Sequence, residues 1–424
     1  MSSQYFDVIE HKVLSSYVRE YPGATILNQD EKLYIPVKQY ATRNPTPKLQ
    51  PVTIIAAASV GTPKESYEPI WEVLSEQSSQ FGFSISSIWI ADPVNQAEGE
   101  VINRGKIGDD PSWIDLSRDL FLMINQFRDQ MPRPFIGIGH SAGGVQLADL
   151  AFMHPRLFSS LIFLDPSILK TPPTHFRQHP VFHKYIFNRQ QSWPSRSQAE
   201  ASIAKWPTHS TWDPRCLQRF LKYALVETSE PKSKLSDPPV SFSTSEAQGI
   251  LYMSREARVQ RQVDGTVTID REHAPDLDPI DAERDDPLYR SEMRATWNRL
   301  PELRPSAKFI LGGRTYLSTR ELHEAVDRCG TGLGGSGGAS EGRVCKVVFK
   351  KGSHFFPLEL VDETAKECAV WIHAEVERWM KKENEFKDSV RRRLENGERI
   401  GQEFSPSMRN LLNSFAPNAA KSKI

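Results

Sequence analysis

The chain has 424 residues, which is long enough for one large domain with insertions or for two ordinary domains. Lys plus Arg and Asp plus Glu each count 53, so no net field attracts nucleic acid or an anionic membrane, and a nucleic-acid partner is not expected. The four cysteines match neither a CxxC metal pattern nor a dense disulfide framework. We interpret them as reduced thiols of an intracellular protein, and we expect neither a metal site nor a cofactor.

The two ends of the chain differ in targeting information. The N-terminal stretch MSSQYFDVIEHKVLSSYVRE lacks an apolar segment behind a basic start, and no apolar run approaches the roughly 20 residues that span a bilayer. We therefore expect a protein that is neither secreted nor membrane-spanning. The chain ends in Ser422, Lys423 and Ile424, a close variant of the S-K-L address. This ending predicts binding to the peroxisomal import receptor and a location in the peroxisome.

The first 166 residues alternate between short apolar runs and amphipathic stretches. The apolar runs are rich in β-branched residues and predict strands at residues 33–40, 52–58, 84–93, 134–139 and 158–166. Helical periodicity lies between them at residues 67–81, 112–127 and 145–153, and Ser112 is expected to start the second of these helices. This alternation predicts a mostly parallel, doubly wound sheet covered on both faces.

The alternation stops after residue 166 and returns after residue 300. Residues 167–300 mix Pro and Trp with polar runs and show no series of strands. Strand patterns return at residues 306–313 and 342–356, and a long helical pattern follows at residues 359–380. We predict one α/β domain built from residues 1–166 and 301–381, interrupted by a lid insertion at 167–300. The charged tail at 382–424 is expected to hold a solvated helix and the targeting signal.

A glycine-rich stretch, GTGLGGSGGASEG, lies at residues 330–342. A phosphate-binding loop would open a helix and carry a Lys-Ser or Lys-Thr pair, whereas this stretch runs into a predicted strand without that pair. We interpret it as a flexible connector.

The stretch PFIGIGHSAGGVQL at residues 134–147 contains a serine between glycines. Its central residues fit G-x-S-x-G, the nucleophile elbow of the α/β-hydrolases, and the motif stands between a predicted strand and a predicted helix, as the elbow requires. The same pentapeptide also occurs by chance in glycine-rich turns. In the elbow, the sharp turn lifts the Ser141 hydroxyl above the sheet edge. The Ala142 N–H, at the helix start, would then face the negative charge that develops on a substrate oxygen.

A serine hydroxyl is a poor nucleophile until a base removes its proton. Of the eleven histidines, His354 is best placed, because it follows a predicted strand in KKGSHFFPLE, the last strand-to-helix loop of the sheet. His140 belongs to the elbow itself. The histidines in the helix or in the insertion, His209 among them, are more often structural. We therefore predict Ser141 as the nucleophile and His354 as its base.

The sequence leaves two candidates for the acid that orients the histidine. Asp165 ends the strand predicted at residues 158–166, the position that the acid occupies in pancreatic-type lipases, although an Asp before Pro166 is also a common turn former. Glu321 is the first carboxylate after the strand predicted at residues 306–313. We favour Asp165, with Glu321 as the alternative acid.

A second oxyanion donor should come from the loop that follows the strand predicted at residues 52–58. Ser59 and Val60 lie in this loop, in AAASVGTPKE, and their backbone N–H groups are the candidates. The loss of one such donor typically lowers the rate by about 10² to 10³. The loop is therefore expected to matter for catalysis although its side chains are small.

Several stretches, specific in combination, resemble a fungal branch of the α/β-hydrolases over most of the chain. This branch includes peroxisomal lipase-like proteins and, more closely, the peroxisomal hydrolases of host-selective toxin clusters of the AK-, AF- and ACT-toxin type. The stretches are REYPGAT, VKQYATRNP, GTPKESYEPIWEVL, DDPSWIDLSRDLF, GIGHSAGGVQL, TGLGGSGG, KGSHFFPLE and the terminal SKI. The chain departs from these relatives at Ala58-Ser59-Val60-Gly61, where they often carry a His-Gly-type stretch, and DPVNQAEGE lacks their His-Gly-x-Ser.

The resemblance implies a peroxisomal serine hydrolase in the biosynthesis of an epoxy-decatrienoic-acid-type host-selective mycotoxin, with Ser141 as nucleophile and His354 as base. We expect acylation of Ser141 by an ester or thioester, and acyl-CoA is the leading substrate in a peroxisome. Two alternatives stay open: an acyltransferase on the same fold, and a hydrolase-fold pathway component without turnover. An epoxide hydrolase or dehalogenase is disfavoured, because those mechanisms use a carboxylate at the elbow.

Overall fold

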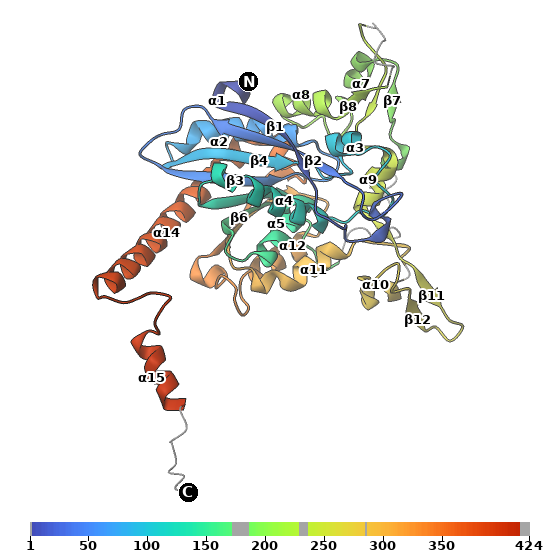
Figure 1. Cartoon of the computed structure of the whole chain (residues 1–424). Coiled ribbons are helices and arrows are strands. Elements are labelled where there is room, and N and C mark those ends of the chain that lie inside the picture. The colour runs from blue at the N-terminus through green and yellow to red at the C-terminus, as the bar shows by residue number, and fades with distance from the viewer. Residues whose placement is uncertain (1, 172–185, 229–235, 285, 416–424) are drawn as a thin grey trace. The chain divides into compact units, whose positions relative to one another are not determined.

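An eight-stranded sheet forms the centre of the fold (Figure 1). In spatial order its strands are β1 (Phe6–Leu14), β2 (Tyr34–Thr42), β4 (Phe83–Ala91), β3 (Gln50–Ala57), β5 (Phe135–His140), β6 (Phe158–Leu164), β14 (Ser306–Arg314) and β15 (Val344–Ser353). The pairs β1–β2 and β2–β4 are antiparallel, and all other neighbouring pairs are parallel. The predicted mostly parallel α/β sheet is confirmed, and the carboxyl ends of its parallel strands meet at one edge.

The computed structural model describes residues 2–171, 186–228, 236–284 and 286–415. The chain divides into two compact units, Met1–Glu375 and Val376–Ile424. The sheet, the elbow and the flanking helices belong to the first unit.

Continuous apolar runs form the middle strands because both faces of a parallel sheet are covered by helices. All six residues of β5 are buried, as are the last six of β3. Strand β1 was missed in the sequence because it lies at the edge of the sheet and most of its side chains are exposed. An edge strand of this kind carries little of the alternation that marks a half-buried strand.

Helices flank the sheet. The longer ones in the first unit are α2 (Glu68–Ser78), α4 (Ile114–Gln126), α5 (Ala142–Met153), α11 (Ser291–Arg299), α12 (Thr319–Arg328) and the start of α14 (Val361–Glu395). Of these, α2, α4, α5 and α14 lie where the periodicity predicted helices, whereas α11 and α12 were not predicted. Short helices are α1 (Ser2–Tyr5), α3 (Ala97–Ile102) and α13 (Phe356–Glu359). Helix α5 contacts β3, β5 and β6 beneath it and α4 and α11 beside it. It is therefore apolar around most of its circumference, as a helix inside the core must be.

The described part of the stretch between β6 and α11 folds into small elements gathered to one side of the central sheet (Figure 1). Its helices are α7 (Arg196–Ile203), α8 (Pro214–Tyr223), α9 (Glu246–Met253) and α10 (Pro279–Glu283). Its strands form three small sheets: β7 (Ser192–Trp193) and β8 (Leu225–Glu227) on either side of β9 (Val240–Phe242), β10 (Arg255–Glu256) with β13 (Leu288–Tyr289), and β11 (Val259–Arg261) with β12 (Val267–Ile269). The expectation of no strand series here was incomplete, because strands of two or three residues are too short to show a period.

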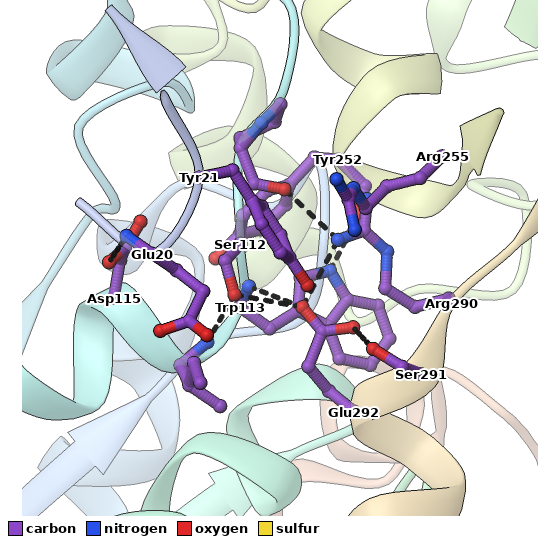
Figure 2. Close-up of polar contacts among 12 residues, drawn as sticks. Glu20, Tyr21, Ser112, Trp113, Asp115, Tyr252, Arg255, Arg290, Ser291 and Glu292 are labelled. Carbon is purple, nitrogen blue, oxygen red and sulfur yellow. Dashed lines mark hydrogen bonds and ion pairs between the residues drawn. The ribbon is translucent and has the colours of Figure 1, made fainter. Parts of the chain in front are cut away.

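Buried polar contacts join this stretch to the start of α4 (Figure 2). The Glu292 carboxylate accepts hydrogen bonds from the Ser112 hydroxyl at 2.9 Å and the Trp113 N–H at 3.0 Å. Arg290, whose side chain has no exposed surface, donates to Glu292 at 3.1 Å and to the Pro111 carbonyl at 3.0 Å. Helix α4 begins at Ile114, whose N–H donates to the Ser112 hydroxyl, consistent with the predicted helix start. A buried, hydrogen-bonded ion pair thus fixes the end of the insertion to the core.

The glycine-rich stretch at residues 330–342 follows a defined path instead of the flexible one that its composition predicted. Its N–H groups at Gly332 and Ser336 donate to the carbonyls of Pro301 and Leu303 at 2.7 and 2.9 Å. Several glycines have positive φ angles, including Gly330. Glycine adopts this backbone conformation without strain, so the composition reflects turn geometry.

The second unit contains the remainder of α14 and helix α15 (Pro406–Phe415). Most side chains of this unit that the structure describes are exposed, in agreement with the predicted solvated helix. The terminal residues Ser422, Lys423 and Ile424 lie outside the described residues. Among the described helices, none is both long enough and apolar enough to cross a membrane.

Candidate active site

The turn between β5 and α5 holds Ser141 in a strained backbone conformation. Its φ and ψ angles are 56° and −117°, a combination that non-glycine residues rarely adopt. The neighbouring glycines have no room for a side chain. A Cβ atom at Gly139 would lie 2.5 Å from the Gly143 carbonyl oxygen, and one at Gly143 would lie 2.2 Å from the Ala57 carbonyl oxygen. The sequence therefore needs glycine on both sides of the serine to close this turn, as the elbow motif requires.

The loop after β15 brings His354 to Ser141, across more than two hundred residues of sequence. The His354 Nε2 atom lies 2.9 Å from the Ser141 hydroxyl oxygen. Both side chains are buried, with His354 only 3% exposed. The rings of Phe355 and Tyr316 pack against the His354 ring at centroid distances of 5.2 and 4.6 Å. The imidazole is thus held beside the hydroxyl by packing as well as by hydrogen bonding.

Asp165, at the end of β6, lies on the other side of the imidazole. Its Oδ2 atom is 2.6 Å from His354 Nδ1 and accepts a hydrogen bond from the Thr315 hydroxyl at 2.5 Å, and its Oδ1 atom accepts from the Gly312 N–H at 2.8 Å. The carboxylate is fully buried, and these donors compensate for its desolvation. With Nδ1–H donating to Asp165, the Nε2 lone pair of His354 faces the serine hydroxyl, the tautomer that a general base requires.

Glu321, the alternative acid, lies in the first turn of α12. Its Oε2 atom accepts a hydrogen bond from the Thr171 N–H at 2.9 Å. The two ring nitrogens of His354 bond Asp165 and Ser141, so Glu321 is not a partner of the imidazole. Of the two carboxylates weighed from the sequence, only Asp165 joins the hydrogen-bonded chain.

Ser167 is a member of the site that the motif did not reveal. Its hydroxyl oxygen lies 3.0 Å from the Ser141 hydroxyl oxygen, and its N–H donates to the Ser141 carbonyl at 3.0 Å. Because the Ser141 proton is directed at His354 Nε2, the Ser167 hydroxyl serves as donor to the Ser141 oxygen. The only feature of the sequence that could have indicated Ser167 is its position two residues after Asp165. That position has a meaning only after Asp165 is known to contact His354.

The three backbone donors predicted for an oxyanion come from two neighbouring segments. Ala142 opens α5, so its N–H belongs to the first turn, where backbone donors have no intrahelical partner. Ser59 and Val60 follow β3, whose end contacts Gly143 of the elbow. The Ser59 N–H donates to the Tyr67 hydroxyl at 3.0 Å, whereas the Val60 N–H has no hydrogen-bond acceptor within the described residues.

Aromatic side chains from the insertion reach the residue that follows His354. Trp212 packs against Phe355 at a centroid distance of 5.8 Å and against Phe220 at 5.3 Å, and His209 lies beside both insertion rings. The Asp213 N–H also donates to the Leu358 carbonyl at 2.7 Å. The insertion thus contributes apolar surface close to His354.

A mostly parallel eight-stranded sheet with a nucleophile elbow and an imidazole at its carboxyl edge defines an α/β-hydrolase. No family model matches the chain. However, type I acyl-CoA thioesterase mpaH of Penicillium roqueforti (strain FM164) is 40% identical over 405 residues, which cover 91% of this chain and 92% of the relative. The Penicillium brevicompactum thioesterase mpaH' is 39% identical over 408 residues, or 92% of each chain. The chain belongs to the same α/β-hydrolase family as these mpaH proteins and is an enzyme of the hydrolase class.

The predicted resemblance to the toxin-cluster hydrolases is confirmed over a shorter part of the chain than expected. The abhydrolase domain-containing protein ACTT2-1 of Alternaria alternata is 28% identical over 243 residues, covering 57% of this chain and 84% of the relative. Among solved structures, the peroxisomal alpha-beta-hydrolase Lpx1 of Saccharomyces cerevisiae matches with a TM-score of 0.65 at 16% identity, covering 92% and 98% of the two chains. This structural likeness shows the shared fold.

Proposed function

We propose that this enzyme is a serine hydrolase that cleaves an acyl-CoA thioester into a free acid and coenzyme A. The observation that carries the proposal is the hydrogen-bonded chain from Ser141 through His354 to Asp165, with distances of 2.9 and 2.6 Å. The Penicillium relatives, which match nearly the whole chain, are named acyl-CoA thioesterases and support the choice of substrate class.

In the acylation step, the Ser141 oxygen attacks the thioester carbonyl carbon while His354 Nε2 takes the hydroxyl proton. Asp165 stabilises the imidazolium that forms and holds its orientation. The negative charge on the former carbonyl oxygen is stabilised by the Ala142 N–H and a donor from the loop after β3. The intermediate collapses with cleavage of the carbon–sulfur bond, and the departing thiolate receives the proton from His354.

In the deacylation step, a water molecule takes the place that the thiol has left, next to the acyl carbon and His354. His354 takes a proton from the water as it attacks the acyl carbon, and the proton returns to the Ser141 oxygen when the ester bond breaks. The products are the free acid and the regenerated serine. We further propose that residues 167–300 act as the lid over the acyl chain, supported by the apolar contact between Trp212 and Phe355.

Thiol release from acyl-CoA tests this proposal. Wild-type enzyme should release coenzyme A from a series of acyl-CoA esters and react with a fluorophosphonate probe. Ser141→Ala should lose both reactions. Ser117→Ala is a matched control, because Ser117 is a buried serine whose hydroxyl donates to the Gln146 carbonyl away from the elbow. Absence of thiol release and of labelling in folded wild-type protein would favour a pathway component without turnover.

The same assay separates hydrolysis from acyl transfer. An acyltransferase would release thiol slowly in buffer and much faster with an acceptor alcohol, with the acyl ester as the product. A thioesterase forms the free acid at a rate that the alcohol does not raise. The distinction depends only on which nucleophile attacks the acyl-enzyme.

We also propose a peroxisomal location and a role in secondary metabolism. The terminal Ser422-Lys423-Ile424 supports import by the peroxisomal receptor, and a fluorescent fusion should lose peroxisomal targeting when these three residues are removed. The resemblance to the toxin-cluster hydrolases motivates an epoxy-decatrienoic-type acyl chain in a host-selective toxin pathway. Acyl-CoA and free-acid pools in a deletion strain would identify the chain, and unchanged pools would contradict this role.

A further inference from the structure

A buried imidazole outside the catalytic chain links three segments of the site. His140, the second residue of the elbow motif, is only 1% exposed. Its Nε2 atom lies 2.9 Å from the carbonyl oxygen of His354, and its Nδ1 atom lies 2.7 Å from the Tyr67 hydroxyl. The same hydroxyl accepts the Ser59 N–H at 3.0 Å. One continuous set of contacts therefore runs from the loop after β15, which carries His354, to the loop after β3.

The chemistry of the partners fixes the protons along this path. The His354 carbonyl can only accept, so His140 carries its proton on Nε2, and its Nδ1 accepts from the Tyr67 hydroxyl. The single Tyr67 proton points to His140 Nδ1 at 2.7 Å, which is closer than the Ser59 hydroxyl oxygen at 3.2 Å, and the Tyr67 oxygen accepts the Ser59 N–H. Burial, followed by the charge of His354, holds the pKa of His140 well below its ordinary value, so the ring stays neutral and this proton arrangement is kept.

Tyr67 is itself held by a buried ionic anchor. It ends the short 3₁₀ helix Lys64–Tyr67, whose first residue is tied to Asp92 twice. The Lys64 N–H and ammonium donate to the two Asp92 oxygens at 2.9 and 2.8 Å. The Tyr67 ring also stacks on Trp71 at a centroid distance of 6.3 Å. The hydroxyl therefore has a fixed position from which it can orient the loop after β3.

We infer that Tyr67 and His140 are positioning residues that hold the loop after β3, so that Val60 and not Ser59 supplies the second oxyanion donor. This inference rests on the proposed serine hydrolase mechanism. The Ser59 N–H is committed to the Tyr67 hydroxyl, whereas the Val60 N–H has no acceptor in the part of the chain that the structure describes. A bond between the Ser59 and Thr62 hydroxyls at 2.8 Å closes the turn around Val60.

Tyr67→Phe removes one hydroxyl from the path and preserves the packing of the ring. The Ser59 N–H and His140 Nδ1 then lose their shared partner, and the loop is free to reorient. We expect kcat to fall by about tenfold, which is less than the roughly 10² to 10³ for outright loss of a donor, with KM within about twofold. Affinity for a trifluoromethyl ketone analogue of the thioester, whose adduct places an oxyanion in the site, should fall by a similar factor.

Tyr252→Phe provides the matched control. Tyr252 is also buried, and its hydroxyl accepts a hydrogen bond from the Gln146 amide at 2.8 Å, outside the path. This variant should keep the wild-type kcat and analogue affinity. If Tyr67→Phe has the wild-type kcat and the wild-type affinity for the trifluoromethyl ketone, or if only its KM changes, the inference is overturned. The proposed hydrolase mechanism would not be affected by that result.

An amide-to-ester replacement separates the two loop donors without changing a side chain, and it decides the question if Tyr67→Phe does not fold. Removing the Val60 N–H in this way should lower kcat by about 10² to 10³, and the same change at Ser59 should have a smaller effect. The reverse order would overturn the assignment of Val60. Wild-type enzyme without thioesterase activity or probe labelling would instead refute the proposed function, and the inference with it.

Discussion

Replacing Asp165 by Asn perturbs the orienting acid while preserving its size. The carboxylate accepts hydrogen bonds from the Gly312 N–H, the Thr315 hydroxyl and His354 Nδ1. In the variant, the amide oxygen can still accept from Gly312, which places the NH₂ group against His354. That group donates to Nδ1 and so shifts the imidazole proton to Nε2. The lone pair that should take the Ser141 proton is then lost.

The expected loss follows from the tautomer change. An acid-to-amide exchange that leaves the geometry intact and fixes the wrong tautomer lowers kcat by about 10⁴. This factor corresponds to about 5 kcal/mol of transition-state stabilisation. Steady-state thiol release from acyl-CoA measures kcat, and circular dichroism verifies that the variant is folded. Residual activity from the oxyanion donors should remain above that of buffer alone.

Glu321→Gln is the matched control for this exchange. Its carboxylate bonds the Thr171 N–H, which the Gln amide oxygen can still accept, so kcat should stay within about twofold of wild type. Activity of Asp165→Asn within tenfold of wild type, or loss of activity in Glu321→Gln alone, would refute the assignment of Asp165 and the reasoning from the hydrogen-bonded chain.

Three further variants test the surroundings of the elbow and the insertion. Ser167→Ala removes one hydrogen bond to the Ser141 oxygen, worth about 1 kcal/mol, so the rate of fluorophosphonate labelling should fall about fivefold; an unchanged rate would show that Ser167 does not orient the nucleophile. Gly143→Ala places a methyl group 2.2 Å from the Ala57 carbonyl oxygen, so the backbone must shift. The variant should have a lower kcat, and its free energy of unfolding, measured by urea titration, should fall by about 1 to 3 kcal/mol; wild-type stability would contradict the packing argument. Burial lowers the pKa of His209 to about 4 from an ordinary value of 6.5, so its contribution to stability is complete above pH 6.5 and is lost as the pH falls toward 4. Between pH 6.5 and pH 4, the free energy of unfolding of wild type should therefore decrease by about 3 kcal/mol more than that of His209→Phe. An equal decrease in the two proteins would contradict the lowered pKa of His209.

The sequence predicted those features of the fold and site that have a local signature. Continuous apolar runs located the parallel strands, and the G-x-S-x-G motif located Ser141 at the turn between β5 and α5. Strand β1 lacked such a signature because its side chains at the sheet edge are largely exposed. The strands of the insertion were too short for any period to appear.

The partners of the elbow could be predicted only where the topology limits the choice. The carboxyl ends of parallel strands share one edge, so the loops after β15 and β6 were reasonable places for His354 and Asp165. Nothing local distinguishes Tyr67 from other tyrosines, because its role depends on a contact with His140 across the fold. Ser59 and Val60 could not be separated either, since hydrogen-bond partners in the folded loop distinguish their N–H groups.

The central claim is that Ser141 carries the acyl group during turnover. Mass spectrometry of peptides from enzyme quenched during acyl-CoA turnover tests it directly. The account predicts an acyl adduct on the peptide containing Ser141 that appears before free acid accumulates and is absent from Ser141→Ala. An adduct on another residue, or continued thiol release by Ser141→Ala at the wild-type rate, would contradict the account.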